Sequence, residues 1–154
     1  MTCFLAIDQS TSATKALLVD GTGRVLGRES ASHRQSYPQP GWCEQDAAEI
    51  WRNTLQVLHH LLGRHRDRWP HLACLSICNQ RETTVVFDRA SGEPLHPAVV
   101  WQCRRSEAIC ERHRQAGHGE LVRSRTGLRI DPYFSASKLQ WLIEPARGLE
   151  DQLR

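Results

Sequence analysis

The stretch that most constrains the fold is residues 3–20, where two apolar runs flank a loop rich in hydroxyl groups. The first run predicts a buried strand that ends at Asp8, and the second run begins after Lys15. The loop between them carries Thr11 and Ser12. Such a hairpin suits a metal-bound polyphosphate, because the carboxylate offers Mg²⁺ a hard oxygen while the loop and the lysine attract phosphate oxygens. An ordinary hairpin with a solvated polar loop explains the stretch equally well.

Composition narrows the class of protein. The 154 residues suffice for one domain with a real core, and 40% hydrophobic and 24% charged residues are typical of a globular protein. The net charge of +3 is scattered, and the densest basic cluster, residues 64–68, is typical of a solvated helix end, so we expect no nucleic-acid partner. No apolar segment approaches the roughly 20 residues that span a bilayer, and the N-terminus lacks a signal-peptide pattern. We therefore expect a cytoplasmic protein with no membrane partner, whose six cysteines are reduced thiols.

The pattern of the remaining chain predicts an α/β domain with a mixed sheet. Residues 24–30 extend the first two strands into an antiparallel meander. Asp46 and Glu49 form a capping box that starts an amphipathic helix ending near Gly63. The apolar positions of that helix are Ala47, Ile50, Trp51, Leu55, Leu58, Leu61 and Leu62. The apolar run 72–78 predicts a central strand, buried on both faces and parallel to its neighbour.

Arg81 and Glu82 follow that strand, at the end where open α/β sheets bind ligands. Together they present a hydrogen-bond donor and an acceptor, although a local ion pair at a surface loop accounts for them as well. Two aromatic residues further along, Trp101 and Tyr133, suit either a core or a ligand contact. Further elements are expected at residues 83–87 and 98–101 as strands, at 106–116 as a helix, and from Ser135 as a last capped helix.

Five motifs follow one another along the chain: Ala6-Ile7-Asp8-Gln9-x-Thr11-Ser12, Pro38-Gln39-Pro40-Gly41-Trp42, Asn79-Gln80-Arg81-Glu82-Thr83-Thr84, Val100-Trp101-Gln102-x-Arg104-Arg105 and Asp131-Pro132-Tyr133-Phe134-Ser135. In this order and spacing they resemble the glycerol kinases, a group of the FGGY carbohydrate kinases within the actin-like, ribonuclease-H-like ATPase superfamily. The likeness extends over essentially the whole chain. The stretches around Glu82 and Tyr133 resemble the glycerol branch rather than the pentose kinases.

The resemblance implies that residues 1–154 are an incomplete N-terminal domain of a kinase that uses ATP and Mg²⁺ to convert glycerol into sn-glycerol 3-phosphate. It implies glycerol contacts at Arg81, Glu82, Trp101 and Tyr133. It implies phosphate contacts at Thr11, Ser12, Ala13 and Lys15, and a magnesium site at Asp8. These residue types suit a small neutral triol, because every hydroxyl group that is buried needs a donor or an acceptor.

The sequence also departs from the implied pattern. Family members usually carry glycine at position 10 and arginine at position 15, where this chain has Ser10 and Lys15, and a lysine lacks the bidentate phosphate grip of arginine. The family is about three times longer, as two actin-like domains require. The aspartate base and the adenine-binding domain are therefore expected beyond Arg154, so we expect the isolated chain to be inactive. The resemblance also implies that the full-length protein is a homo-oligomer. Two alternatives stay open: a non-catalytic module that binds a ligand or a partner protein, and a kinase of another small polyol, suggested by Cys103 near Trp101.

Overall fold

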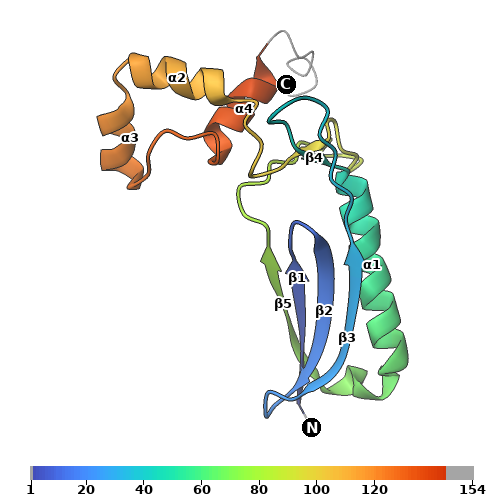
Figure 1. The fold of residues 1–154 in the computed structure, drawn as a ribbon. Helices are drawn as coiled ribbons and strands as arrows, with labels where there is room; N and C mark the ends of the chain where they lie inside the picture. The colour runs from blue at the N-terminus through green and yellow to red at the C-terminus, as the bar shows by residue number, and fades with distance from the viewer. Residues whose placement is uncertain (1, 145–154) are drawn as a thin grey trace. The chain divides into compact units, whose positions relative to one another are not determined.

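The computed structural model describes residues 2–144, which form two compact units (Figure 1). Unit 1 comprises Met1–Gln35 and Asp46–Gln80, and unit 2 comprises Ser36–Gln45 and Arg81–Arg154. Buried apolar side chains form one cluster in each unit. Each unit therefore has a core of its own.

Unit 1 is built on a four-stranded sheet in the order β3-β2-β1-β5. Its strands are β1 (Cys3–Gln9), β2 (Ala13–Asp20), β3 (Val25–Ser32) and β5 (Leu72–Asn79). The first three strands form the predicted antiparallel meander, because short loops reverse the chain between the apolar runs. β5 runs parallel to β1, after helix α1 (Ala47–Arg64) and the short 3₁₀ turn η1 (Arg66–His71) have carried the chain back along the sheet. The predicted mixed sheet of an α/β fold is confirmed.

Helix α1 lies along one face of this sheet, over β2 and β3 (Figure 1). It begins at the predicted N-cap Asp46, whose carboxylate accepts a hydrogen bond from the Ala48 N–H at 2.9 Å. The other half of the predicted capping box is wrong, because the Glu49 side chain binds Arg34 instead of the N–H of Asp46. The Glu49 carboxylate accepts hydrogen bonds from the backbone N–H and the Nε of Arg34, at 2.9 and 3.0 Å. It thereby fastens the helix start to the residues that follow β3. The core between helix and sheet consists of Cys3, Leu5, Ala16, Leu18, Val57 and Leu61.

The apolar face of α1 is narrower than its spacing predicts. Leu61 is fully buried, whereas Trp51 is 62% exposed and Leu55 is 46% exposed. At about 100° per residue, those two side chains lie well round the helix from the line of Val57 and Leu61 that contacts the sheet. Helix α1 and strand β3 pack closely at Leu61. A Cβ atom added to Gly27 of β3 would lie only 2.9 Å from Leu61 Cδ1.

The position of β5 corrects another prediction. The run 72–78 predicts a central strand buried on both faces, but β5 ends the sheet order, and within residues 2–144 its one neighbour is β1. Leu75 is 47% exposed and Ile77 is 64% exposed. The physical reason is that α1 packs over β2 and β3, so the apolar side chains of β5 meet solvent on both faces.

Unit 2 consists of short elements around a second core. Strand β4 (Glu44–Gln45) pairs with β6 (Ala98–Val99), and the helices are α2 (Glu107–Gln115), α3 (Gly119–Thr126) and α4 (Ser135–Ile143). The sequence predicts α2 within one residue at each end, but it does not predict α3. The core consists of Cys43, Val99, Val100, Cys103, Ile109, Trp141 and Leu142. No helix within residues 2–144 is long and apolar enough to cross a membrane.

The strand predicted at residues 83–87 is absent as a regular element. Isolated bridges pair Thr84 with Val99 and Phe87 with Pro94. The pairing cannot lengthen into a ladder, because β6 itself spans two residues and a proline has no N–H to donate. The segment is an irregular connection that carries single backbone contacts.

The start of α4 is also different from the prediction. Ser135 is its first helical residue, and the N-cap position belongs to Phe134. The carboxylate that satisfies the helix terminus comes from Glu82, which accepts a hydrogen bond from the Ser135 N–H at 2.8 Å. Helix N-termini attract negative charge, so a carboxylate from a distant segment replaces the expected serine cap.

Candidate functional site

The hairpin of β1 and β2 brings Asp8 and Lys15 together. The two residues are directly opposite in register, and their side chains leave the face of the sheet that α1 does not cover. Lys15 Nζ lies 3.7 Å from Asp8 Oδ2, and the two side chains are 52% and 45% exposed. A pair this exposed contributes little to stability, so both charges can turn to a ligand.

The loop between β1 and β2 is held by its own backbone. Ser10 donates two hydrogen bonds to the Ala13 carbonyl, from its N–H at 3.0 Å and its Oγ at 2.8 Å. The Ser12 carbonyl accepts a hydrogen bond from the His33 N–H at 2.8 Å. Carbonyl oxygens repel phosphate, and these bonds engage two of them within the protein, while the Ser12 side chain stays exposed and Thr11 is half-buried. Ser10 is not among the described residues with positive φ, so a serine fits this position without strain.

Unit 2 gathers Glu82, Trp101 and Tyr133, three of the four residues implied as glycerol contacts. The rings of Trp101 and Tyr133 meet edge to face, with their centroids 5.7 Å apart. The backbone N–H of Trp101 donates to Thr83 Oγ1 at 3.2 Å, which joins the tryptophan to the segment that carries Glu82. The Glu82 carboxylate in turn binds Ser135, two residues after the tyrosine. An aromatic corner and a carboxylate are thus linked by direct contacts.

Glu82 is fixed at both its backbone and its side chain. Its φ of 65° is a conformation that non-glycine residues seldom adopt. Its Oε2 accepts hydrogen bonds from the Ser135 N–H at 2.8 Å and the Ser135 Oγ at 2.7 Å. Within residues 2–144 its second oxygen, Oε1, has no partner, so it can accept a hydrogen bond from a ligand. Strained residues that their surroundings hold in place are typical of functional sites.

Arg81 precedes this carboxylate and is exposed. Its side chain makes no hydrogen bond or ion pair with any of the described residues. The local ion pair with Glu82 that the sequence also allowed is therefore not formed. An unengaged guanidinium next to a fixed carboxylate offers a ligand both donors and an acceptor.

The chain also buries an arginine four residues after Trp101. The Arg105 side chain has no exposed surface, and its Nη2 lies 2.6 Å from Glu44 Oε1. Its guanidinium carbon lies 4.1 Å from the centre of the Trp42 ring and 4.7 Å from that of Trp141. The two aromatic rings and the carboxylate compensate much of the cost of burying the guanidinium, although its Nη1 has no hydrogen-bond partner among the described residues. Arg105 therefore connects three segments of unit 2.

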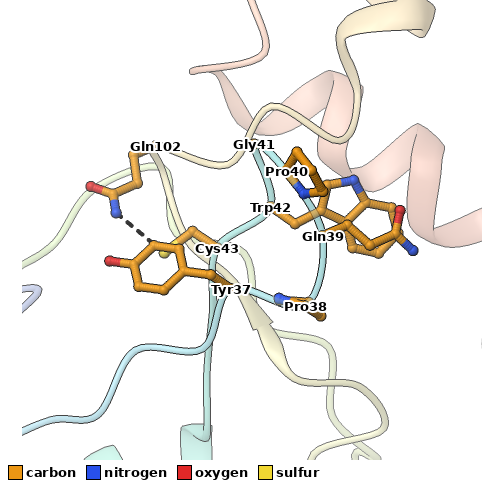
Figure 2. Close-up of a pocket in the computed structure, with 8 residues that line it drawn as sticks. All are labelled: Tyr37, Pro38, Gln39, Pro40, Gly41, Trp42, Cys43 and Gln102. Carbon is orange, nitrogen blue, oxygen red and sulfur yellow. Dashed lines mark hydrogen bonds between the residues drawn. The ribbon is translucent and has the colours of Figure 1, made fainter.

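Trp42 also lines a hollow of about 530 Å³ (Figure 2). Its lining residues are Tyr37, Pro38, Gln39, Pro40, Gly41, Trp42, Cys43 and Gln102. The Gln102 amide donates to Cys43 Sγ at 3.2 Å, and burial raises the pKa of the Cys43 thiol, so the sulfur stays protonated at neutral pH. None of the residues that the resemblance implies as ligand contacts lines this hollow, and it offers no charged group.

Metal-ligating side chains are sparse in the described part of the chain. Residues 2–144 contain no group of three or more His, Cys, Asp or Glu side chains that can hold an ion. A magnesium ion that arrives with a nucleotide needs less, because it keeps several waters and takes one or two carboxylates besides the phosphates. Asp8, exposed at the end of β1, fits that requirement.

Comparison with known proteins identifies the family. The N-terminal domain model of the FGGY family of carbohydrate kinases matches residues 3–154. The chain belongs to this family. A glycerol kinase of Stenotrophomonas maltophilia is 48% identical over 148 residues, which are 96% of this chain and 30% of that protein. Glycerol kinase 1 of Thermotoga maritima is 42% identical over 150 residues, 97% of this chain and 30% of that protein.

Solved structures of the FGGY family agree with the fold. The crystal structure of Plasmodium falciparum glycerol kinase with ADP matches with a TM-score of 0.91 at 31% identity, over 99% of this chain and 30% of that one. The xylulose kinase of Rhodospirillum rubrum matches with a TM-score of 0.85 at 27% identity, over 94% and 30%. The chain thus spans about 30% of the length of the curated relatives that it matches.

Three residues at the site have roles that sequence reasoning missed: Arg105, Ser135 and Lys138. Lys138 is fully buried and donates hydrogen bonds to the carbonyls around Tyr133. One signal for it was available, because Lys138 lies three and four residues before Trp141 and Leu142 and so shares the apolar face of α4. A charge on such a face indicates a buried, fully bonded group.

Proposed function

We propose that this chain is the glycerol- and phosphate-binding part of an FGGY kinase that transfers a phosphoryl group from ATP to glycerol. Residues 1–154 are then a partial N-terminal domain, and the adenine-binding domain is supplied elsewhere. The observation that carries the proposal is the linked set of Glu82, Trp101 and Tyr133, with the unengaged Arg81 beside it. The glycerol kinase relatives support the choice of substrate.

The four residues divide the recognition of a triol among them. Arg81 donates hydrogen bonds to hydroxyl oxygens, and Glu82 Oε1 accepts a hydroxyl proton. The face of Trp101 packs against the carbon chain, and the phenol of Tyr133 bonds the remaining hydroxyl. Each hydroxyl that leaves water is then paired, which a tight site for a small neutral molecule requires.

The hairpin of unit 1 supplies the phosphate side of the proposal. Thr11 and Ser12 donate hydroxyl hydrogen bonds to the transferred phosphate, and Ala13 contributes its backbone. Lys15 leaves Asp8 to contact the nucleotide phosphates, and Asp8 then holds Mg²⁺ through water. The bound ion neutralises the charge that phosphoryl transfer develops. None of the acids within residues 2–144 is assigned as the base that deprotonates the attacking hydroxyl, so the isolated chain is expected to bind but not to turn over.

Glycerol binding to the purified chain tests the proposal, by saturation-transfer NMR with 1,3-propanediol as the control that lacks the central hydroxyl. Arg81→Met is expected to weaken glycerol binding by about tenfold or more, since a hydrogen bond to a charged group contributes about 1.5–3 kcal/mol. Arg81 is exposed and unengaged, so the variant keeps its unfolding midpoint. Equal affinity for glycerol and propanediol in both proteins contradicts the proposal.

Turnover by the purified chain is the companion measurement. We expect no glycerol 3-phosphate from glycerol and ATP above the level of a Lys15→Ala or Asp8→Ala control. ATP-dependent product above those controls overturns the statement that the base lies outside residues 1–154.

A second candidate function rests on β5. Within residues 2–144 this strand has one neighbour, and it exposes Leu75 and Ile77, so it offers both an edge and an apolar face to a partner protein. Size-exclusion chromatography and the glycerol-binding measurement together separate the candidates. A chain that elutes as a monomer and binds no glycerol favours a partner-binding module. Glycerol binding favours the kinase.

A further inference from the structure

Lys138 on helix α4 is buried without exposed surface, and it is one of only two lysines in the chain. The other, Lys15, is half exposed. An ammonium group is expensive to bury unless hydrogen bonds replace its water. Its partners therefore indicate what the burial achieves.

Those partners are three consecutive backbone carbonyls. Lys138 Nζ donates to the carbonyl of Pro132 at 2.7 Å, to that of Tyr133, and to that of Phe134 at 3.5 Å. An ammonium group has three N–H donors, so the number of carbonyls matches the number of protons. Burial lowers the pKa of Lys138, and the charge of the nearby Glu82 opposes that shift.

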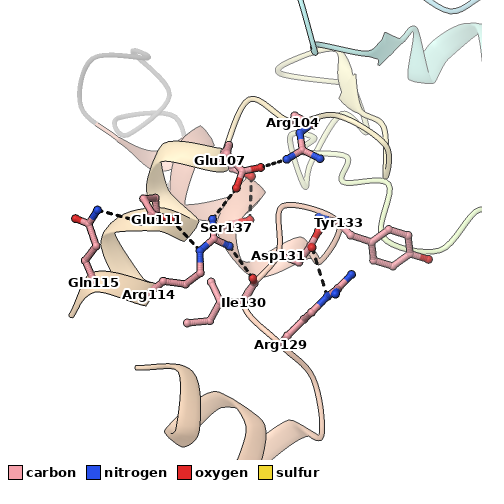
Figure 3. A network of polar contacts seen from close by, with 11 residues as sticks. Arg104, Glu107, Glu111, Arg114, Gln115, Arg129, Ile130, Asp131, Tyr133 and Ser137 are labelled. Carbon is pink, nitrogen blue, oxygen red and sulfur yellow. Dashed lines mark hydrogen bonds and ion pairs between the residues drawn. The ribbon is translucent and has the colours of Figure 1, made fainter. Parts of the chain in front are cut away.

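The same turn is held from two other directions (Figure 3). The Tyr133 N–H donates to Asp131 Oδ1 at 2.9 Å, and Arg114 Nη1 donates to the Ile130 carbonyl at 2.9 Å. The Arg129 guanidinium lies 3.5 Å from Asp131. These contacts fix the approach to Tyr133 from outside, whereas Lys138 holds the carbonyls of the turn itself from the buried side.

Glu82 and Lys138 hold neighbouring parts of one structure. Glu82 binds the N–H and the hydroxyl of Ser135, the first residue of α4. Lys138, three residues later, binds the carbonyls of the residues that lead into the helix. One end of α4 therefore sets both the carboxylate of Glu82 and the ring of Tyr133, which in turn meets Trp101 at 5.7 Å.

We propose that Lys138 is a positioning residue of the polyol site, whose buried ammonium fixes the turn 132–134 and so holds Tyr133 in place against Trp101. The proposal rests on the proposed function for its ligand. It goes beyond that function because Lys138 touches no substrate and acts through the backbone of the tyrosine. Without the ammonium group the three carbonyls lose their common donor, and the tyrosine ring loses its fixed direction.

The composition of the chain makes a direct test possible, because two lysines and two tyrosines, Tyr37 and Tyr133, are the whole set of each. Lysine labelled with ¹⁵N at Nζ reports the ammonium groups in the full 154-residue chain. We expect Lys138 to give a slowly exchanging signal at neutral pH, and the exposed Lys15 to exchange rapidly. A Lys138 signal that exchanges as fast as that of Lys15, or a neutral amine at this position, overturns the proposal.

Fluorotyrosine in the same chain reports the consequence for the ring, by ¹⁹F NMR. Lys138→Met keeps the length of the side chain but has no donor, and it is expected to shift the Tyr133 signal to the position of free fluorotyrosine and to abolish its response to glycerol. The Tyr37 signal stays in place, and Lys15→Met moves neither tyrosine. An unchanged Tyr133 signal and glycerol response in Lys138→Met contradict the proposal.

The two proposals fail in different ways. If glycerol moves no signal in the wild-type chain while Lys138→Met still releases Tyr133, the choice of glycerol is wrong and the role of Lys138 stands. If Lys138→Met also loses the Tyr37 signal, unit 2 has unfolded in that variant. The exchange rate of the Lys138 ammonium in the wild-type chain then tests the proposal: slow exchange supports it and fast exchange overturns it.

Discussion

The two units position their candidate site residues in different ways. In unit 1, Asp8 and Lys15 face each other because antiparallel pairing places them in register, so the backbone ladder does the positioning. In unit 2 the paired strands β4 and β6 span two residues each, and Glu82, Arg105 and Lys138 make the connections through charged side chains. We therefore expect surface substitutions in unit 1 to leave Asp8 and Lys15 opposite each other. In unit 2, the loss of one buried charged group should disturb the residues that it connects.

The largest expected effect is therefore the loss of a buried charge in unit 2. Arg105→Ala leaves Glu44 without its partner and opens space between two tryptophans, and it should lower the free energy of unfolding by about 3–5 kcal/mol. Urea unfolding measures the loss, and hydrogen exchange should rise in α4 and β6 but not in β1. The matched control is Arg104→Ala, because that side chain is 66% exposed. Equal effects of the two substitutions contradict the comparison.

A core substitution tests unit 1 in the same way. Leu61→Ala removes a fully buried side chain between α1 and the sheet, and it should cost about 3 kcal/mol. Leu55→Ala, on the exposed side of the same helix, should cost less than about 1 kcal/mol. Hydrogen exchange should rise in β1 and β2 for Leu61→Ala. A rise confined to unit 2 means that the two units do not have separate cores.

A pH dependence is expected in unit 1 because burial lowers the pKa of His33, against the opposing charge of Glu49. The ring accepts from Asn53 Nδ2 at its Nδ1 and donates from Nε2 to Thr14 Oγ1, and a second proton on the ring disrupts the first contact. The unfolded chain binds that proton near pH 6.5, so stability falls as pH drops below about 6.5. Urea unfolding between pH 5 and 7 measures the slope, which His33→Gln should reduce. His60→Gln, at an exposed position, should leave it unchanged.

The smallest expected effect on stability is at the hairpin. Lys15→Ala removes an exposed ion pair, so the free energy of unfolding should change by less than about 0.5 kcal/mol. Thermal unfolding checks this value. A loss of several kcal/mol shows instead that Lys15 is a structural residue, which removes it from the proposed phosphate site.

Sequence reasoning worked where periodicity and register determine the structure. The meander, α1, α2 and the parallel direction of β5 follow from apolar spacing and turn residues, and the family resemblance is confirmed by the match over residues 3–154. It failed where the outcome depends on what packs on an element from elsewhere in the chain. The run in β5 is apolar throughout, yet composition does not reveal that α1 covers other strands.

The side-chain connections of unit 2 were out of reach for a related reason. Glu82 caps a helix 53 residues later in the chain, and Arg105 pairs with a carboxylate 61 residues earlier. No local pattern encodes such distant partners. Lys138 was the exception, because its place on an apolar helix face is visible in the sequence.

The contrast between the two lysines has a practical consequence for labelling. Amine-directed reagents such as succinimidyl esters need an accessible lysine, and the chain carries its remaining positive side chains almost entirely as arginine. With Lys138 enclosed, Lys15 is the one side-chain amine that such a reagent meets in the folded protein. A dye can thus be attached beside the loop between β1 and β2 without any engineered cysteine. Once the α-amino group has been blocked, the rate at which a second dye attaches reports how readily the fold opens around α4.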